Sequence, residues 1–313
     1  MPKNQLKEIG VFDLDKLQEN FFRNYNPDYW KYKIILLKNS HDYYDDIKDK
    51  LADDQEEIDD EYCKRVIRTE LHFLYFQMIE TLFETIFAIC EHENRDLWLA
   101  LTFSNDRETH YYSDCYTKIK KFANGNLQTP DLWSKIDVKI KDKPVKIQLL
   151  RWIFYYHYSS KMSDEDWKIN LNKIHSLLKT FAKDFSDRGE YNAYKHSLRF
   201  FTSPSYFAMV ENGSNTGVAR KSEDSIIYIE ESKEQGSLNF KPIVITSKPF
   251  DFYRDYVCCL IIYHFLKNII NTRKYTFLEN LHEEKFKFAT FLDVKIPEDI
   301  TPKTGFIKSK FPV

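Results

Sequence analysis

Apolar residues recur at helical spacing along most of the chain, and the longest such pattern covers residues 61–93. Its apolar positions are Leu71, Leu74, Tyr75, Met78, Leu82, Ile86 and Ile89, and Phe73, Phe76, Phe83 and Phe87 widen the apolar surface. Polar residues, glutamates among them, occupy the other side. A helix with so broad an apolar arc packs against several neighbours. The pattern therefore predicts one long helix at the centre of a helical bundle.

Shorter periodic segments predict further helices around this one. The clearest lies over 163–185, where Ser163 and Asp166 form a capping pair ahead of an apolar stripe. Other helices are expected over 14–22, 95–103, 106–122, 145–160, 251–272 and 277–291. Residues 128–143 are interpreted as a connection with a short basic stretch, and Pro144 suits the first turn of the helix that follows.

Other segments lack helical periodicity and differ in composition. Residues 42–61 hold eleven acidic residues against two lysines, which is typical of a solvated helix or linker, with a partner-binding tail as the alternative. A strand is expected over 206–210, and β-branched runs over 226–229 and 243–246 complete the prediction of a small antiparallel insertion near 204–248. The predicted fold class is mainly α. We expect an N-terminal elaboration over 1–60, a helical bundle with the β insertion over 61–291, and an irregular tail over 292–313.

Composition narrows the classes of function. The 46 basic and 48 acidic side chains give a net charge of −2, so any RNA site must be a local patch. The seven glycines form no phosphate-cradling loop such as G-x-G-x-x-G. Five cysteines without a C-x-x-C pair indicate a reduced, intracellular protein. The most apolar run, 256–270, is too short to span a bilayer. We therefore predict a soluble, cytoplasmic chain with no membrane partner.

The sharpest chemical signal is the stretch 187–201. A helix is expected here, with Asp187 and Glu190 as its capping pair. Its inward face would carry Tyr191, Tyr194, Leu198 and Phe201, and its polar face Asn192, Lys195, His196 and Arg199, with Arg188 just upstream. Two cations, an imidazole and an amide can together bind a phosphate and transfer a proton. The alternative is an ordinary solvated face with one incidental histidine.

Within this stretch, Asn192-Ala193-Tyr194-Lys195-His196 resembles the motif of the HEPN superfamily of nucleotide- and RNA-associated proteins. Many members carry an arginine, a following polar residue and a histidine, with four to six residues between arginine and histidine. Asn192 and His196 match the polar position and the histidine. Tyr191 occupies the arginine slot of the closest spacing, and Arg188 lies one residue beyond the usual range. The resemblance covers residues 61–272, but only the short motif is specific.

The resemblance implies RNA binding or metal-independent RNA cleavage, in a toxin–antitoxin or phage-defence context. Family sites are often composed by two chains, which implies a homodimer. His196 would transfer the proton, Asn192 would orient the ring or the substrate, and Lys195 would face the phosphate. Arg188, Arg199 and Tyr191 are assigned to substrate binding. Because Tyr191 replaces the arginine, the resemblance favours an inactive member that binds RNA without cleaving it.

A competing hypothesis is a non-catalytic helical interaction or regulatory protein with a degenerate motif and a protein partner. No cofactor is expected from either hypothesis. A carboxylate metal site at Glu80 and Glu84 is disfavoured, because a di-metal bundle uses Glu-x-x-His twice and the chain offers it only at Glu279–His282.

Overall fold

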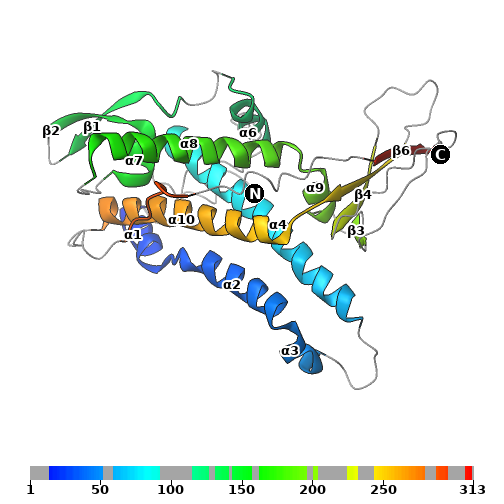
Figure 1. Cartoon of the computed structure of the whole chain (residues 1–313). Helices are drawn as coiled ribbons and strands as arrows, with labels where there is room; N and C mark the ends of the chain where they lie inside the picture. The colour runs from blue at the N-terminus through cyan, green and yellow to red at the C-terminus, as the bar shows by residue number, and fades with distance from the viewer. Residues whose placement is uncertain are drawn as a thin grey trace, which may run out of the picture. The chain divides into compact units, whose positions relative to one another are not determined.

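The computed structural model describes residues 14–51, 59–91, 115–126, 131–140, 143–156, 162–195, 200–203, 224–231, 243–278, 287–294 and 307–311. The fold is mainly α-helical with small antiparallel sheets, as the sequence predicts (Figure 1). The described helices are α1 (Leu14–Asn24), α2 (Asp28–Asp42), α3 (Tyr44–Leu51), α4 (Asp60–Glu91), α6 (Cys115–Ala123), α7 (Leu149–Tyr155), α8 (Asp164–Ser186), α9 (Gly189–Lys195) and α10 (Phe252–Phe277). The strands are β1 (Lys135–Ile140), β2 (Lys143–Gln148), β3 (Phe200–Ser203), β4 (Ser225–Glu231), β5 (Ile243–Pro249) and β6 (Ile307–Phe311).

The chain divides into two compact units, each assembled from separate stretches. Unit 1 comprises Met1–Tyr29, Glu80–Lys183 and Ile262–Leu292. Unit 2 comprises Trp30–Ile79, Asp184–Ile261 and Asp293–Val313. The long helices α4, α8 and α10 contribute residues to both units.

Helix α8 forms where its capping signal and apolar stripe predict it. The Ser163 hydroxyl accepts a hydrogen bond from the Asp166 amide at 3.1 Å and donates one to the Asp166 carboxylate at 2.8 Å. These bonds satisfy polar groups that a helix N-terminus leaves open. The predicted stripe is buried throughout: Trp167, Leu171, Ile174, Leu178 and Phe181. The long central helix is likewise confirmed as α4.

Helix α4 is also apolar enough to be tested as a membrane span. Of the described helices, it alone has the length and composition to cross a bilayer, and 72% of its most apolar 18-residue window is buried inside the protein. The core helix of a globular domain has the same properties.

Two strands replace the connection expected over 128–143. In the β1–β2 hairpin, Ile136 pairs with Ile147 and Val138 with Val145. Pro144 therefore lies in a strand and not in a helical first turn, and α7 is shorter than the helix expected over 145–160. The alternation of lysine or aspartate with Ile136, Val138 and Ile140 has a period of two, which favours a strand.

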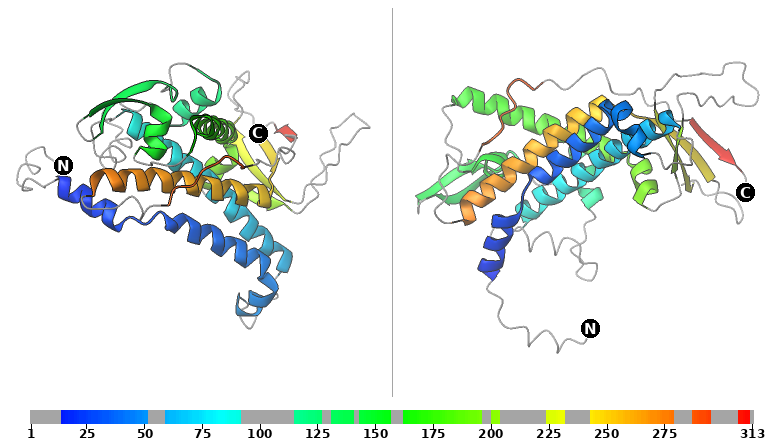
Figure 2. Two further views of the ribbon diagram at one scale, coloured as in Figure 1. Left: turned by 60° about the vertical axis from the view of Figure 1, so that its left-hand side comes forward. Right: turned by 90° about the horizontal axis from the view of Figure 1, so that it is seen from below.

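Unit 2 contains a four-stranded antiparallel sheet in the order β3-β4-β5-β6, seen with α9 beside it in Figure 2. The predicted β-branched runs form β4 and β5. The sheet extends beyond the expected insertion at both ends of its order. Phe200 and Phe201 leave the predicted helix and pair with Tyr228 and Ile227. Strand β6 lies in the tail that was expected to be irregular.

Residues 287–291 do not form the end of the helix expected over 277–291. Instead, the side-chain amides of two asparagines form hydrogen bonds with the backbone of this segment. Asn268 donates to the Ala289 carbonyl at 2.8 Å and accepts from the Ala289 amide at 2.9 Å, and Asn170 accepts from the Phe291 amide at 2.7 Å. These bonds satisfy backbone groups that a helix would otherwise pair. The helix expected over 95–103 and the strand expected over 206–210 lie outside the described residues.

Candidate functional site

Helix α9 carries the described part of the predicted motif, and it has the two faces that the sequence predicts. Tyr191 and Ala193 are buried, whereas Asn192 and Lys195 are exposed. The helix is shorter than expected and ends at Lys195. His196 and Arg199 lie outside the described residues. The structure therefore brings Asn192 and Lys195 to the same exposed face.

Aromatic rings hold the inner face of α9 in unit 2. Tyr191 stacks on Phe76 with centroids 5.6 Å apart, and Tyr194 stacks on Phe73 at 4.0 Å. Tyr191 is only 3% exposed, so its ring packs inside the protein. The predicted role of Tyr191 in substrate binding would require a ring that is open to solvent. Arg188 is half-buried, with its guanidinium 4.6 Å from the Phe185 ring centroid.

Gly189 permits the close approach of α9 to the sheet. A Cβ atom at this position would overlap the hydroxyl and ring of Tyr228 on β4. A larger residue would force the first turn of α9 away from that strand. Gly189 is therefore required for the packing of α9 against β4.

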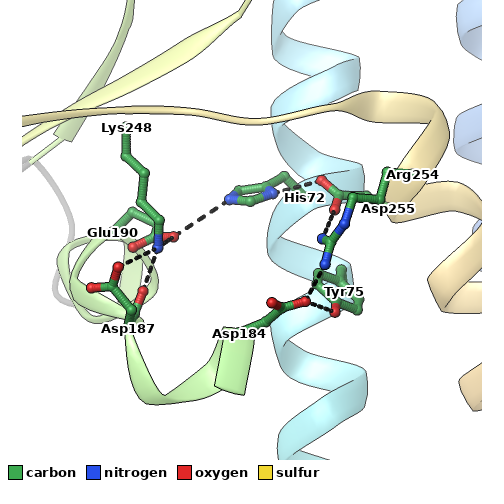
Figure 3. A network of polar contacts seen from close by, with 8 residues as sticks. All are labelled: His72, Tyr75, Asp184, Asp187, Glu190, Lys248, Arg254 and Asp255. Carbon is green, nitrogen blue, oxygen red and sulfur yellow. Dashed lines mark hydrogen bonds and ion pairs between the residues drawn. The ribbon is translucent and has the colours of Figure 1, made fainter. Parts of the chain in front are cut away.

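Beneath α9, a buried histidine from α4 lies between two carboxylates (Figure 3). His72 Nδ1 is 2.6 Å from Asp255 Oδ2 on α10, and His72 Nε2 is 3.7 Å from Glu190 Oε1 on α9. The ring stacks on Phe250 at 4.6 Å and meets Phe76 edge-on at 5.0 Å. An imidazolium between two carboxylates and enclosed by rings is a strongly coupled, desolvated arrangement.

Glu190 has a different role from the one its sequence position suggests. It was expected to cap α9, but its carboxylate is fully buried and lies 2.6 Å from Lys248 Nζ on β5. Lys248 also donates to the Asp187 backbone carbonyl and lies 3.5 Å from the Asp187 carboxylate. The ion pair is favoured over the cap because Lys248 supplies a full positive charge inside the protein. It joins α9 to β5.

A second set of contacts continues from Asp255. Arg254 Nη1 lies 3.6 Å from Asp255 Oδ1, and Arg254 Nη2 forms an ion pair with Asp184 near the end of α8. The Tyr75 hydroxyl donates to Asp184 at 2.5 Å. Burial beside Asp184 raises the pKa of Tyr75, so this hydroxyl stays protonated and remains a donor. Figure 3 shows the side chains of this network, which come from α4, the end of α8, α9 and the residue Asp187 before it, β5 and α10.

The charge state of this network follows from its geometry. Burial opposes a positive charge on His72, but Asp255 and Glu190 outweigh it and raise the pKa of the ring. Burial alone would raise the pKa of Glu190, but His72 and Lys248 lower it. His72 is only 6% exposed, so no substrate can reach its nitrogens from solvent. The network therefore holds α9 against α4, β5 and α10 through buried charges.

The sequence carried little signal for this network. His72 interrupts the apolar face of α4, and Asp255 follows the start of α10, but the two are 183 residues apart. Only the fold brings them together. Among the described residues, no group of three His, Cys, Asp or Glu side chains is arranged to hold a metal ion.

No protein-family model, no curated protein and no solved structure matches this chain.

Proposed function

We propose that this protein binds RNA without a metal ion, through the polar face of α9. One observation carries the proposal: α9 is fixed from below by buried rings and ion pairs, and it presents Asn192 and Lys195 to solvent one turn apart. A lysine and an amide on a rigid helix face can contact a phosphate and a neighbouring sugar or base. Asn192 is also the described residue that matches the polar position of the HEPN motif.

Binding is favoured over cleavage. Tyr191 occupies the arginine slot and is buried against Phe76 and Phe185, so it supplies no cation to a phosphorane. Cleavage would depend on His196 and the neighbouring cations. A metal-free cleavage activity that disappears in His196→Ala would replace this proposal with an endoribonuclease.

The test is a titration of the full chain with structured and single-stranded RNA in the presence of a chelator. Lys195→Ala should weaken binding about five-fold and lower the slope of log affinity against log salt concentration by about 0.7, because one phosphate contact is lost. Lys31→Ala, which removes an exposed lysine from α2, is the matched control and should change neither quantity. Equal affinities for Lys195→Ala and wild type would contradict the proposal.

A protein partner or a second copy of the chain is the second candidate, and α2 favours it. On α2, Tyr32 and Leu36 are 65% and 67% exposed, and their spacing of four residues puts them on one face. Exposed apolar side chains that line up in this way are typical of a contact surface. Wild type that fails to bind RNA and has the mass of two chains by light scattering at micromolar concentration would favour this second candidate.

A further inference from the structure

The β1–β2 hairpin of unit 1 has one face of charged side chains. Along β1, Lys135 and Asp137 are exposed, and the alternate residues Ile136 and Val138 are half-buried. Lys146 on β2 is exposed and pairs with Asp137 across the ladder. The two strands together contain four lysines and one acidic residue. The exposed lysines of this face, Lys135 and Lys146, outnumber its one exposed carboxylate, so the face is locally basic on a chain whose net charge is −2.

The base of the hairpin is fixed to its surroundings. The ladder continues past the strands, because the Leu149 amide donates to the Ser134 carbonyl at 2.9 Å and the Leu150 amide to the Leu132 carbonyl at 3.0 Å. Leu132, Leu149 and Leu150 are buried. A two-stranded hairpin alone is marginally stable, and this anchoring supplies the packing that it needs.

An aromatic side chain lies next to these lysines. Trp133 is only half-buried and lies two residues before Lys135, the first residue of β1. Its ring lies 5.4 Å from that of His175 on α8, edge to face, and Phe122 on α6 lies 5.9 Å from the same imidazole. Helix α6 adds the exposed Lys120 and the half-buried Lys121. Trp133 is thus held at the foot of a basic hairpin with part of its ring open to solvent.

Lysines on a rigid strand contact phosphates without regard to base sequence, and a partly exposed tryptophan can stack on an unpaired base. An acidic protein surface would use the lysines but has no base to place on the indole ring. The combination favours single-stranded nucleic acid over an acidic protein.

We propose that the β1–β2 hairpin, with Trp133 at its base, is a second contact surface for the backbone and bases of single-stranded RNA. The identity of the ligand as RNA rests on the proposed function, but the contact involves none of the residues of α9.

The experiment measures RNA affinity and its salt dependence in chelator for Lys135→Glu/Lys146→Glu and for Trp133→Ala. The control, Lys31→Glu/Lys183→Glu, reverses two exposed lysines outside the hairpin and changes the net charge equally. The hairpin double variant should lose at least about ten-fold in affinity, and its salt slope should fall by about 1.4, as expected for two phosphate contacts. Trp133→Ala should weaken binding to single-stranded RNA more than to duplex RNA. Circular dichroism should match wild type for each variant.

Lys195→Ala, measured in parallel, separates this inference from the proposed function. If Lys195→Ala weakens binding and the hairpin double variant behaves like its control, the hairpin proposal is wrong and the α9 proposal stands. The reverse result overturns only the α9 proposal. Binding to vesicles rich in phosphatidylserine that depends on Lys135 and Lys146, with no RNA binding by wild type, overturns both.

Discussion

Replacing Lys248 with methionine should lower the free energy of unfolding by about 3–5 kcal/mol, because the fully buried Glu190 carboxylate loses the nearer of its two cationic partners and keeps only His72, at 3.7 Å. Methionine keeps much of the apolar length of lysine, so the loss reports the charge more than the volume. The Asp187 carbonyl also loses its donor. Urea unfolding of the full chain, followed by far-UV circular dichroism, measures the change.

A second variant distinguishes a broken ion pair from general damage. Lys248→Met/Glu190→Gln removes both charges and should recover most of the lost stability, since an uncompensated buried charge is what costs the most. The matched control is Lys48→Met, which breaks the more exposed pair with Asp60 at 3.2 Å and should cost at most about 1 kcal/mol. If Lys248→Met costs no more than Lys48→Met, the pair does not hold α9 in place.

The second large effect concerns His72 and the pH dependence of stability. The pKa of His72 is raised in the folded protein, so the folded protein binds this proton more tightly than the unfolded chain does. Protonation of His72 therefore stabilises the fold. This contribution is fully present below the ordinary histidine pKa of about 6.5, and it is lost as the pH rises through the raised value. Burial also raises the pKa of Asp255, so its contribution to stability is likewise lost as the pH rises. Glu190, whose pKa is lowered, contributes stability that is lost only as the pH falls through that lowered value.

His72→Gln should therefore destabilise the protein most at about pH 6 and less as the pH rises toward about 9. Each unit by which the folded pKa exceeds the unfolded one is worth about 1.4 kcal/mol. His264→Gln, at an exposed histidine of α10, is the control and should show no such trend. A stability difference between wild type and His72→Gln that does not vary with pH would mean that His72 is neutral in the folded state.

Local patterns were enough to predict the long helices α4, α8 and α10. The apolar arc of α4 and the Ser163–Asp166 cap of α8 are properties of neighbouring residues, and both are found where they were expected. The same is true of β4 and β5, whose β-branched runs favour strands. Mainly α with a small antiparallel sheet follows from these segments alone.

Errors arose where distant residues decide the local structure. Phe200 and Phe201 continue a helical pattern in sequence, but pairing with β4 makes them a strand. Glu190 fits a capping position, but Lys248 is 58 residues away in the chain and attracts it more strongly. No local pattern contains the information that β5 passes beside α9, so neither the ion pair nor the His72 network could be predicted.

The candidate site was predicted in part. The two-faced character of α9 and the exposure of Asn192 and Lys195 follow from helical spacing, and both are present. The support beneath that face was missed, because it comes from α4, β5 and α10. The resemblance to the HEPN motif remains a hypothesis about function that the binding experiments address.

Photo-crosslinking tests the central claim, RNA contact through α9, most directly. Full-length protein is irradiated in chelator with an RNA that carries photoreactive thiouridine, and the crosslinked peptides are identified by mass spectrometry. We expect crosslinks in the peptide containing residues 189–195, in addition to any in 133–148, and competition by unlabelled RNA should remove them. Crosslinks confined to other parts of the chain, with none in 189–195 under saturating RNA, would contradict the claim.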